Sequence, residues 1–482
     1  MRVNDTFEYL SIGLPEDIQR RKIYGDFEGA VRIIELRLAD NGTSEPLRRC
    51  LTVQKEIIKR LPDNYPYTKG EALDIIRTKV PDFTMDELDN LIDTGQVSWI
   101  YIQGEMHIFS GFFSTLCKTN HDFARRSGIS LSGSESDLTE PEHSSVMRSR
   151  LKEEGRFSNR IRMKAWIKLK DELFTPGMKV KVHLPIPADC DEQSDIVIES
   201  FFPEGASIAP SDAPQRTVCW QEIMEENHIF SVEYSYTYTA LFHDTQAAEA
   251  GTEAGQSAAP CTEAGCPHPD FNKPDFDTLN SYTDEKQPHI VFTPYIRALA
   301  ESLTEGVTNP MEKARIFYDF ITLNMRYTFM PEYFVLESIA ETCARNYTGD
   351  CGVFALLFIT LCRCSGIPAR WQSGLVAEPD FVGAHDWARF YVAPYGWFFA
   401  DPSYGISAAR AGNEERRKFY FGNIDSFRMI ANNEFQAPFT IDKDFWRADP
   451  YDNQYGEFES SERGFESCDL EYDCEMIKYE VI

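Results

Sequence analysis

Residues 353–361 read VFALLFITL, a run that is apolar on every face of a helix. A helix of this kind has no face for solvent, so it predicts a central, fully buried helix with the rest of a domain packed around it. The run follows GDCG (349–352) and ends at GIP (366–368), where glycine and proline are usual signals for the end of a helix. Cys351 is therefore expected in the first turn of a buried helix.

A cysteine at this position has a chemical meaning. The unpaired N–H groups and the positive dipole end of a helix favour an anion, which lowers the pKa of a thiol and raises its nucleophilic thiolate fraction. Gly352 would leave room for a substrate backbone to approach. Asp350 opposes the thiolate unless its side chain is turned to cap the helix. The alternative is that Cys351 is an ordinary small core residue.

A histidine and an aspartate follow on two predicted strands. In HDWARFYV (385–392) and WFFADPSYG (397–405), alternation places the imidazole of His385 and the carboxylate of Asp401 on one face of a hairpin. The turn residues PYG (394–396) make the two diagonal rather than direct neighbours, roughly 7–8 Å apart at the backbone, a gap that both side chains can close. A nucleophile, a base and a group that orients the base are then all present.

The blocks GDCGVFALLFITLCRCSGIPAR and GAHDWARFYVAPYGWFFADPSYG resemble the transglutaminase-like superfamily over about residues 295–435. The resemblance implies a papain-like core in which Cys351 is the nucleophile, His385 is the base and then the acid, and Asp401 orients the imidazole. It also implies that the β-rich segment before the core is the sandwich that often precedes it in bacterial members.

The chain departs from the family pattern at two positions. Asp386 stands between the histidine and the next tryptophan, where many relatives have a small residue, and Gly352 follows the cysteine, where many have an acid or a bulky residue. Both departures alter the walls of the expected cleft, so the substrate preference of relatives does not transfer.

Further site residues are assigned less directly. Tyr333 or Tyr327 could supply the second hydrogen-bond donor that most oxyanion holes need, although both could equally be core aromatics. Trp371 and Trp387, together with Gly352, could line a substrate cleft, and the alternative for the tryptophans is core packing.

The N-terminal part, residues 1–126, is predicted to be mainly helical. TMDE (84–87) has the spacing of a capping box, and VSWIYIQGEMHIF predicts a hairpin that turns at Gln103-Gly104. Helices followed by a hairpin are typical of a winged-helix unit. The segment has no obvious basic reading helix, which favours structural packing or protein contact over DNA binding.

The complete prediction is an α+β protein. It has the helical domain at 1–126, a linker at 127–155, an antiparallel β-sandwich at 156–243, a low-complexity linker at 244–288, the transglutaminase-like core at 289–440 and an acidic, solvated or edge-packed tail at 441–482. Within the core, Asn309 and Pro310 predict the start of a helix.

Composition limits the partners. The formal charge of -29 disfavours nucleic acid and anionic membranes, which leaves a protein or peptide substrate, with the oligomeric state open. The chain shows no run of roughly 20 apolar residues and no signal-peptide order, so a cytoplasmic location is expected. Most of the 12 cysteines should then be free thiols. Cys261, Cys266 and His268 offer only three metal ligands, so neither a metal nor a cofactor is expected.

These features predict a cysteine hydrolase that cleaves a peptide or carboxamide bond through a thioester. Hydrolysis is favoured over crosslinking by acyl transfer because water is always available, whereas transfer needs a dry acceptor site. The third possibility is a catalytically silent binding protein with the same fold.

Overall fold

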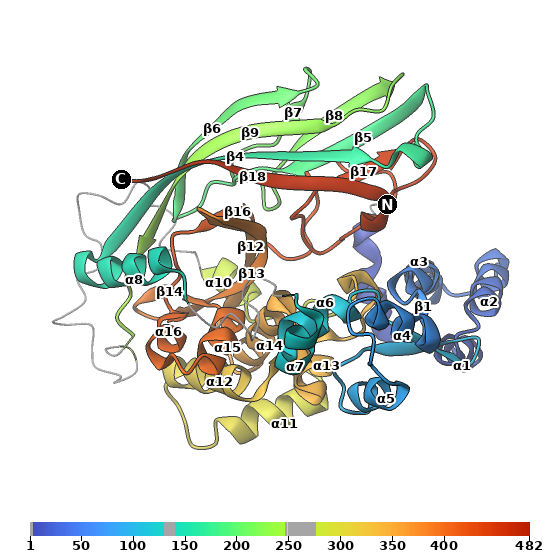
Figure 1. The fold of residues 1–482 in the computed structure, drawn as a ribbon, viewed down its shortest axis with the longest axis horizontal. Coiled ribbons are helices and arrows are strands. Elements are labelled where there is room, and N and C mark those ends of the chain that lie inside the picture. Colours follow the sequence, from blue (N-terminus) through green and yellow to red (C-terminus); the bar gives the residue numbers. More distant parts are fainter. Residues whose placement is uncertain (1–2, 130–139, 246–247, 249–275) are drawn as a thin grey trace.

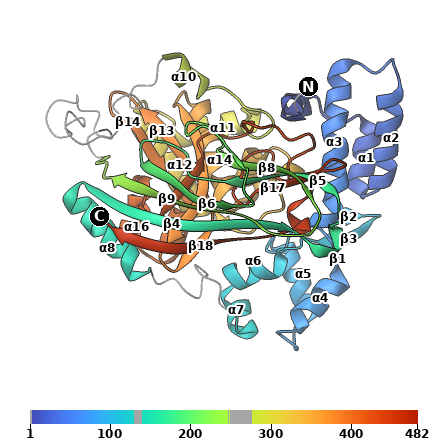
Figure 2. The same cartoon turned by 90° about the horizontal axis from the view of Figure 1, so that it is seen from above.

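The computed structural model describes residues 3–129, 140–245, 248 and 276–482. It combines helices with several antiparallel sheets around a transglutaminase-like core, as the sequence predicts. Figure 1 shows the long strands of the β-sandwich above the core and the N-terminal helices at one side of it, and Figure 2 shows the same arrangement from above.

The predicted buried helix is the centre of the core. α14 (Cys351–Cys364) begins at the cysteine, and its residues from Gly352 to Arg363 are all buried. It packs against a five-stranded antiparallel sheet, where Phe358 meets Phe390 at a ring-centroid distance of 5.6 Å. The strand order is β15 (Phe421–Gly422), β14 (Gly396–Ala400), β13 (Phe381–Val392), β12 (Ala369–Glu378), β16 (Arg428–Asn432).

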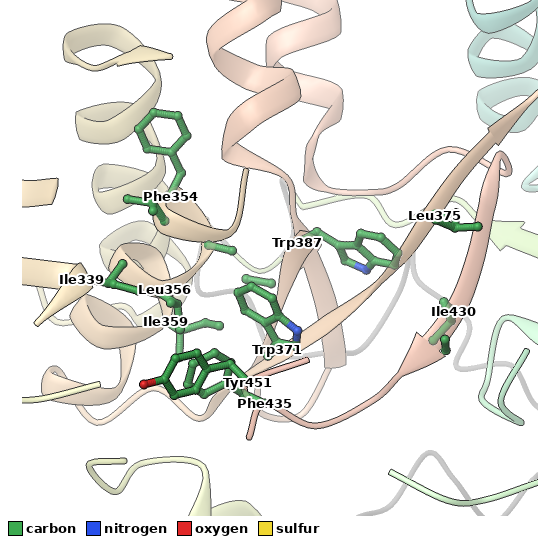
Figure 3. Close-up of a cluster of buried hydrophobic side chains, with 14 of the residues drawn as sticks. Ile339, Phe354, Leu356, Ile359, Trp371, Leu375, Trp387, Ile430, Phe435 and Tyr451 are labelled. Atoms are coloured by element: carbon green, nitrogen blue, oxygen red, sulfur yellow. The ribbon is translucent and has the colours of Figure 1, made fainter. Parts of the chain in front are cut away.

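Helices and aromatic side chains enclose the remaining sides of α14. Figure 3 shows Leu356 and Ile359 beside Trp371, Phe435 and Tyr451, and the last two rings stack at 5.2 Å. The surrounding helices are α11 (Pro294–Leu303), α12 (Pro310–Asn324), α13 (Ile339–Asn346), α15 (Pro402–Arg410) and α16 (Glu414–Phe419). The predicted start of α12 is confirmed, because the side chain of Asn309 accepts hydrogen bonds from the first-turn amides of Met311 and Glu312.

The predicted β-sandwich consists of two four-stranded antiparallel sheets. One sheet has the order β17-β5-β8-β7 and the other β18-β4-β9-β6, and they pack face to face where Trp220 meets Phe230 at 5.5 Å. The bounds are β4 (Arg156–Leu169), β5 (Met178–Pro185), β6 (Gln193–Phe202), β7 (Ser207–Ile208), β8 (Thr217–Met224), β9 (Phe230–Leu241), β17 (Glu457–Ser460) and β18 (Leu470–Val481).

The C-terminal segment differs from the solvated tail that its acidity predicts. β17 pairs with β5, and β18 pairs with β4 over most of the length of that strand, so residues 441–482 complete both sheets of the sandwich. The acidic residues of β18 lie on its exposed positions, while Leu470 is buried and Cys474, Met476 and Tyr479 pack on the core. The option of edge packing was therefore right and that of a solvated tail wrong.

The N-terminal part has the predicted helices and hairpin. Thr84 and Glu87 form a complete capping box at α5, and Gln103 and Gly104 turn the hairpin with positive φ angles of 52° and 80°. β1 (Tyr67–Thr68) joins β2 (Trp99–Ile102) and β3 (Glu105–Ile108) in a small sheet. The helices are α1 (Glu16–Tyr24), α2 (Phe27–Ala39), α3 (Glu45–Asn64), α4 (Lys69–Arg77), α5 (Met85–Asp93), α6 (Phe112–Thr119) and α7 (His121–Ser127), after a 3-10 helix (Val3–Ile12).

Both predicted linkers contain a helix. α8 (Glu142–Glu154) lies in the first and packs on β4, and α10 (Phe276–Ser281) lies in the second. Cys261, Cys266 and His268 fall outside the described residues. The ten cysteines that the structure describes are free thiols, and none of its described helices is long and apolar enough to cross a membrane.

Candidate active site

The start of α14 places the thiol of Cys351. Asp350 is the N-cap of this helix, and its Oδ1 accepts a hydrogen bond from the backbone N–H of Val353 at 3.1 Å. The short strand β11 (Thr348–Gly349) runs into the cap and pairs in parallel with β10 (Arg326–Tyr327). Cys351 is half-buried at this corner, while the residues that follow it are inside the core.

His385 and Asp401 meet as the hairpin geometry predicts. β13 pairs with β14 with Ala388 opposite Ala400, so His385 and Asp401 are diagonal rather than direct neighbours. The imidazole Nε2 lies 2.7 Å from Oδ2 of Asp401, and both side chains are buried. With the proton of a neutral ring on Nε2, the other nitrogen, Nδ1, has a free lone pair that can accept a proton.

A buried arginine, which the sequence analysis missed, fixes the aspartate. Arg428 on β16 is fully buried, and its Nη2 lies 3.1 Å from Oδ2 of Asp401, while the same guanidinium pairs with Asp425. Burial raises the pKa of Asp401, but the imidazole of His385 and the charge of Arg428 outweigh it and hold that pKa below its usual value. Asp401 is therefore a carboxylate.

Burial has the larger effect on the histidine. It lowers the pKa of His385 below its usual value, although the neighbouring carboxylate of Asp401 raises it in part. The ring is consequently neutral at pH 7, the state that a general base requires.

The sulfur of Cys351 contacts the residue after the histidine. Its Sγ donates to Oδ2 of Asp386 at 3.4 Å, and Oδ1 of that carboxyl group accepts a hydrogen bond from Gln454 at 2.6 Å. Within the described residues no hydrogen bond joins Cys351 directly to His385. The thiol contacts the side chain of Asp386, the residue that follows His385 in β13.

The thiol is not ionised in this arrangement, contrary to the expectation from its helix position. Burial raises the pKa of Cys351 well above its usual value, and the carboxyl groups of Asp386 and Asp350 raise it further. Burial and the charge of Asp350 also raise the pKa of Asp386 well above its usual value. The structure thus holds a neutral thiol against an acidic side chain.

The two departures from the family pattern depend on one another. A Cβ atom built on Gly352 would lie 2.6 Å from Oδ2 of Asp386, 2.2 Å from the hydroxyl of Tyr333 and 2.8 Å from the ring of Trp371. All three distances are shorter than real Cβ contacts allow, so the missing side chain at 352 makes room for the carboxyl group at 386.

The two tyrosines proposed as oxyanion donors are differently placed. The hydroxyl of Tyr333 donates to Oδ1 of Asp350, so its proton is already used. Burial raises the pKa of Tyr327 well above its usual value, and a thiolate at Cys351 would raise it further. Tyr327 therefore keeps its hydroxyl proton, and on β10 it pairs with Gly349, two residues before Cys351.

The N-terminal part reaches this corner through α6. The ammonium of Lys118 lies 4.4 Å from the ring centroid of Tyr327 and 5.1 Å from that of Phe329. Burial lowers the pKa of Lys118, while Cys351 and Asp350 raise it. Nothing near Lys118 in the sequence distinguishes it from an ordinary surface lysine, so the sequence analysis did not find it.

Of the two roles open to Trp371 and Trp387, lining a substrate cleft or packing in the core, their burial favours packing in the core. Their side chains are only 1% and 0% exposed. The indole N–H of Trp387 donates to Gln372, and Trp371 packs on Phe435 beneath Gly352. Both support the site from inside the core.

Comparison with known proteins agrees with this core. Residues 297–402 match the Transglutaminase-like superfamily. The chain is also 25% identical over 131 residues to the uncharacterized protein YebA of Bacillus subtilis (strain 168), a match that covers 23% of this chain and 18% of YebA.

Two solved structures are similar at lower identity. A candidate cysteine protease from Cytophaga hutchinsonii is 14% identical, with 67% of this chain and 91% of that chain covered and a TM-score of 0.40. The periplasmic domain of TgpA from Pseudomonas aeruginosa is 12% identical, with 53% and 92% covered and a TM-score of 0.28.

Proposed function

Because residues 297–402 form a transglutaminase-like domain, we propose that this chain is a cysteine-dependent hydrolase that cleaves a peptide or carboxamide bond through a thioester. The observation that carries the proposal is the buried His385–Asp401 pair, held by Arg428, next to Asp386, whose carboxyl group contacts the Cys351 thiol. A neutral imidazole hydrogen-bonded to an ionised carboxylate is the arrangement of a general base.

The proposed reaction begins with release of the thiol from Asp386. Rotation of the Cys351 side chain to another staggered rotamer turns the sulfur away from that carboxyl group. Nδ1 of His385 then takes the thiol proton as the sulfur bonds to the carbonyl carbon. The backbone N–H of Cys351 and the hydroxyl of Tyr327 are the proposed donors to the oxyanion.

The second half of the reaction forms the thioester and then regenerates the free enzyme. His385 gives its proton to the departing nitrogen, the C–N bond breaks, and a thioester remains. Water, deprotonated by the same imidazole, attacks the carbonyl carbon of the thioester. The C–S bond breaks, the imidazole passes its proton to the sulfur, and the acid product leaves. A primary amine in place of water would give an amide crosslink, which is the alternative reaction.

One observation favours the silent binding protein instead. The thiol is neutral and hydrogen-bonded to Asp386, a poor starting state for a nucleophile. The two proposals differ in thiol reactivity: a silent site would react with iodoacetamide no faster than an ordinary exposed thiol, with no change when His385 is replaced.

The reaction itself is tested on glutamine-containing peptides, with and without a primary amine, and with Cys351→Ala as the control. Peptide cleavage or ammonia release that needs Cys351 and no amine supports hydrolysis. Amine incorporation would support crosslinking instead, and no turnover under either condition would refute the enzyme proposal.

A further inference from the structure

Lys118 is a partly buried lysine that packs against aromatic rings rather than against an acidic side chain. It is half-buried on α6, and its ammonium lies over the rings of Tyr327 and Phe329. Tyr327 pairs with Gly349, two residues before Cys351, which places the ammonium near the start of α14. Within the residues that the structure describes, it makes no hydrogen bond and no ion pair of its own. A partly desolvated ammonium without an anionic partner is unfavourable, and attraction to aromatic faces replaces only part of its lost hydration.

The acidic groups at the start of α14 and beside Cys351 already have hydrogen-bond partners. The carboxyl group of Asp350 accepts hydrogen bonds from Tyr333 and from the amide of Val353. That of Asp386 is held by Gln454 and Cys351. These side chains cannot turn to the lysine without giving up bonds that shape the start of α14.

We propose that Lys118 binds a carboxylate of the substrate, close to the bond that Cys351 attacks. The inference rests on the proposed function for the identity of the substrate, and it makes the N-terminal part a contributor to specificity. A carboxylate is the anion that a peptide carries, either at its C-terminus or on an aspartate or glutamate side chain. An ammonium can bind either source in the same way, as a compact positive charge with three donors.

The competing interpretation is that Lys118 only packs N-terminal helix α6 on the core. Arg326 already joins the two parts through its hydrogen bond to the carbonyl of Gly95. A packing role would depend on the length of the lysine stem rather than on its charge, so a methionine of similar length separates the two roles.

The first test uses alkylation of Cys351, because it needs no turnover. Iodoacetate carries a carboxylate and iodoacetamide does not, and the ratio of their rates at one cysteine cancels any change in thiolate fraction. Both rates are followed by mass spectrometry of the Cys351 peptide in the full chain. Lys118→Met is expected to lower the ratio at least about threefold, a modest effect for one charge at short range.

The controls separate charge from folding. Lys118→Arg should keep the ratio within about twofold of the unchanged protein, since it retains the charge. Lys79→Met, which removes an exposed lysine at the end of α4, should leave the ratio unchanged. An unaltered ratio in a folded Lys118→Met protein would overturn the proposal.

The second test identifies the source of the carboxylate. Cleavage is compared for peptides with a free or an amidated C-terminus, and for peptides with glutamate or glutamine beside the scissile bond. A preference of about tenfold for one carboxylate, lost in Lys118→Met, supports the proposal and names the source. Equal cleavage of both pairs would overturn it. If no peptide is cleaved, the proposed function fails, and the alkylation ratio alone decides whether Lys118 attracts an anion to Cys351.

Discussion

At the scale of single residues, the protonation of Cys351 is decided by burial and acidic neighbours rather than by its helix. A helix terminus stabilises a nearby charge by about 0.3–1 kcal/mol, which is less than one pKa unit. Burial and the carboxyl groups of Asp386 and Asp350 act in the opposite direction and prevail. Asp386 is therefore the residue whose removal should most directly change the reactivity of the thiol.

Replacement of Asp386 by alanine is expected to make Cys351 more reactive. Loss of this carboxyl group removes a contribution that raises the thiol pKa and opens the space beside Gly352. Each unit of lowered pKa should speed alkylation by iodoacetamide at pH 7 about three- to fourfold, because the larger thiolate fraction outweighs the lower nucleophilicity. Asp380→Ala, on an exposed turn of the same strand pair, is the matched control. An equal or slower rate in Asp386→Ala would contradict the assignment.

The imidazole of His385 makes a prediction about pH. Its pKa is lowered in the folded protein, so the ring stays neutral at pH values where a free histidine would be protonated. The acid limb of kcat/KM should therefore lie below about 6.5, the ordinary histidine pKa. Asp401→Asn removes the group that raises this pKa, so the limb should move further down while the rate falls at least about 10²-fold. Movement of the limb to higher pH would show that another group is titrating.

At the scale of secondary-structure elements, the sequence predicted helix caps and hairpin contacts, which depend on neighbouring residues. It did not predict contacts between residues that are distant in the chain. The capping box at Thr84 and the start of α14 each depend on residues within one turn, and the hairpin register follows from its turn. The carboxyl group that Cys351 contacts and the arginine that holds Asp401 come from elsewhere in the chain. Nothing local relates Gly352 to Asp386, which are brought together only when α14 packs on β13. Arg428 and Lys118 reach the site from other elements in the same way.

The C-terminal strand shows why composition alone left a solvated and an edge-packed tail both open. Its exposed face is acidic, but Leu470, Cys474 and Met476 at alternate positions pack on the core, and the backbone pairing with β4 does not depend on side-chain charge. Removal of residues 470–482 should expose the edge of β4, lower the urea midpoint of unfolding and promote aggregation. Removal of only the exposed Val481 and Ile482 should change the midpoint little. Equal midpoints for the two truncations would mean that β18 adds no stability.

At the scale of the whole molecule, one buried arginine joins three distant parts of the chain. Arg60 of α3 donates to the carbonyls of Arg447 and Ala448, lies 3.7 Å from Glu466 and covers the ring of Phe334 at 4.6 Å. Its neighbour Asn64 accepts a hydrogen bond from the backbone of Glu332, next to the segment that holds Tyr333. The N-terminal helices, the core and the loops around the C-terminal strands thus meet at a site that contains the carboxyl groups of Glu332 and Glu466.

This junction should make stability fall as the pH rises. Burial raises the pKa of Glu332 to about 7 and that of Glu466 to about 7, and one arginine only partly offsets the burial. An acid whose pKa is higher in the folded than in the unfolded state binds more protons when folded between the two values. Its contribution is therefore complete below about 4.5 and is lost as the pH passes through 7.

Glu332→Gln tests this dependence, because it keeps the shape and removes the titration. The unchanged protein should lose more unfolding free energy between pH 5.5 and 8 than the variant does, by on the order of 1–2 kcal/mol after allowance for partial exposure. Urea unfolding at the two pH values measures the difference, with the exposed Glu305→Gln as the control. If the unfolding free energies of Glu332→Gln and Glu305→Gln changed equally with pH, the group with the raised pKa would not be Glu332. A weaker pH dependence of the unfolding free energy in Glu332→Gln alone would support the assignment. The contact between the N-terminal helices and the core would then be more stable at acidic pH. That contact includes Glu332, which directly precedes Tyr333.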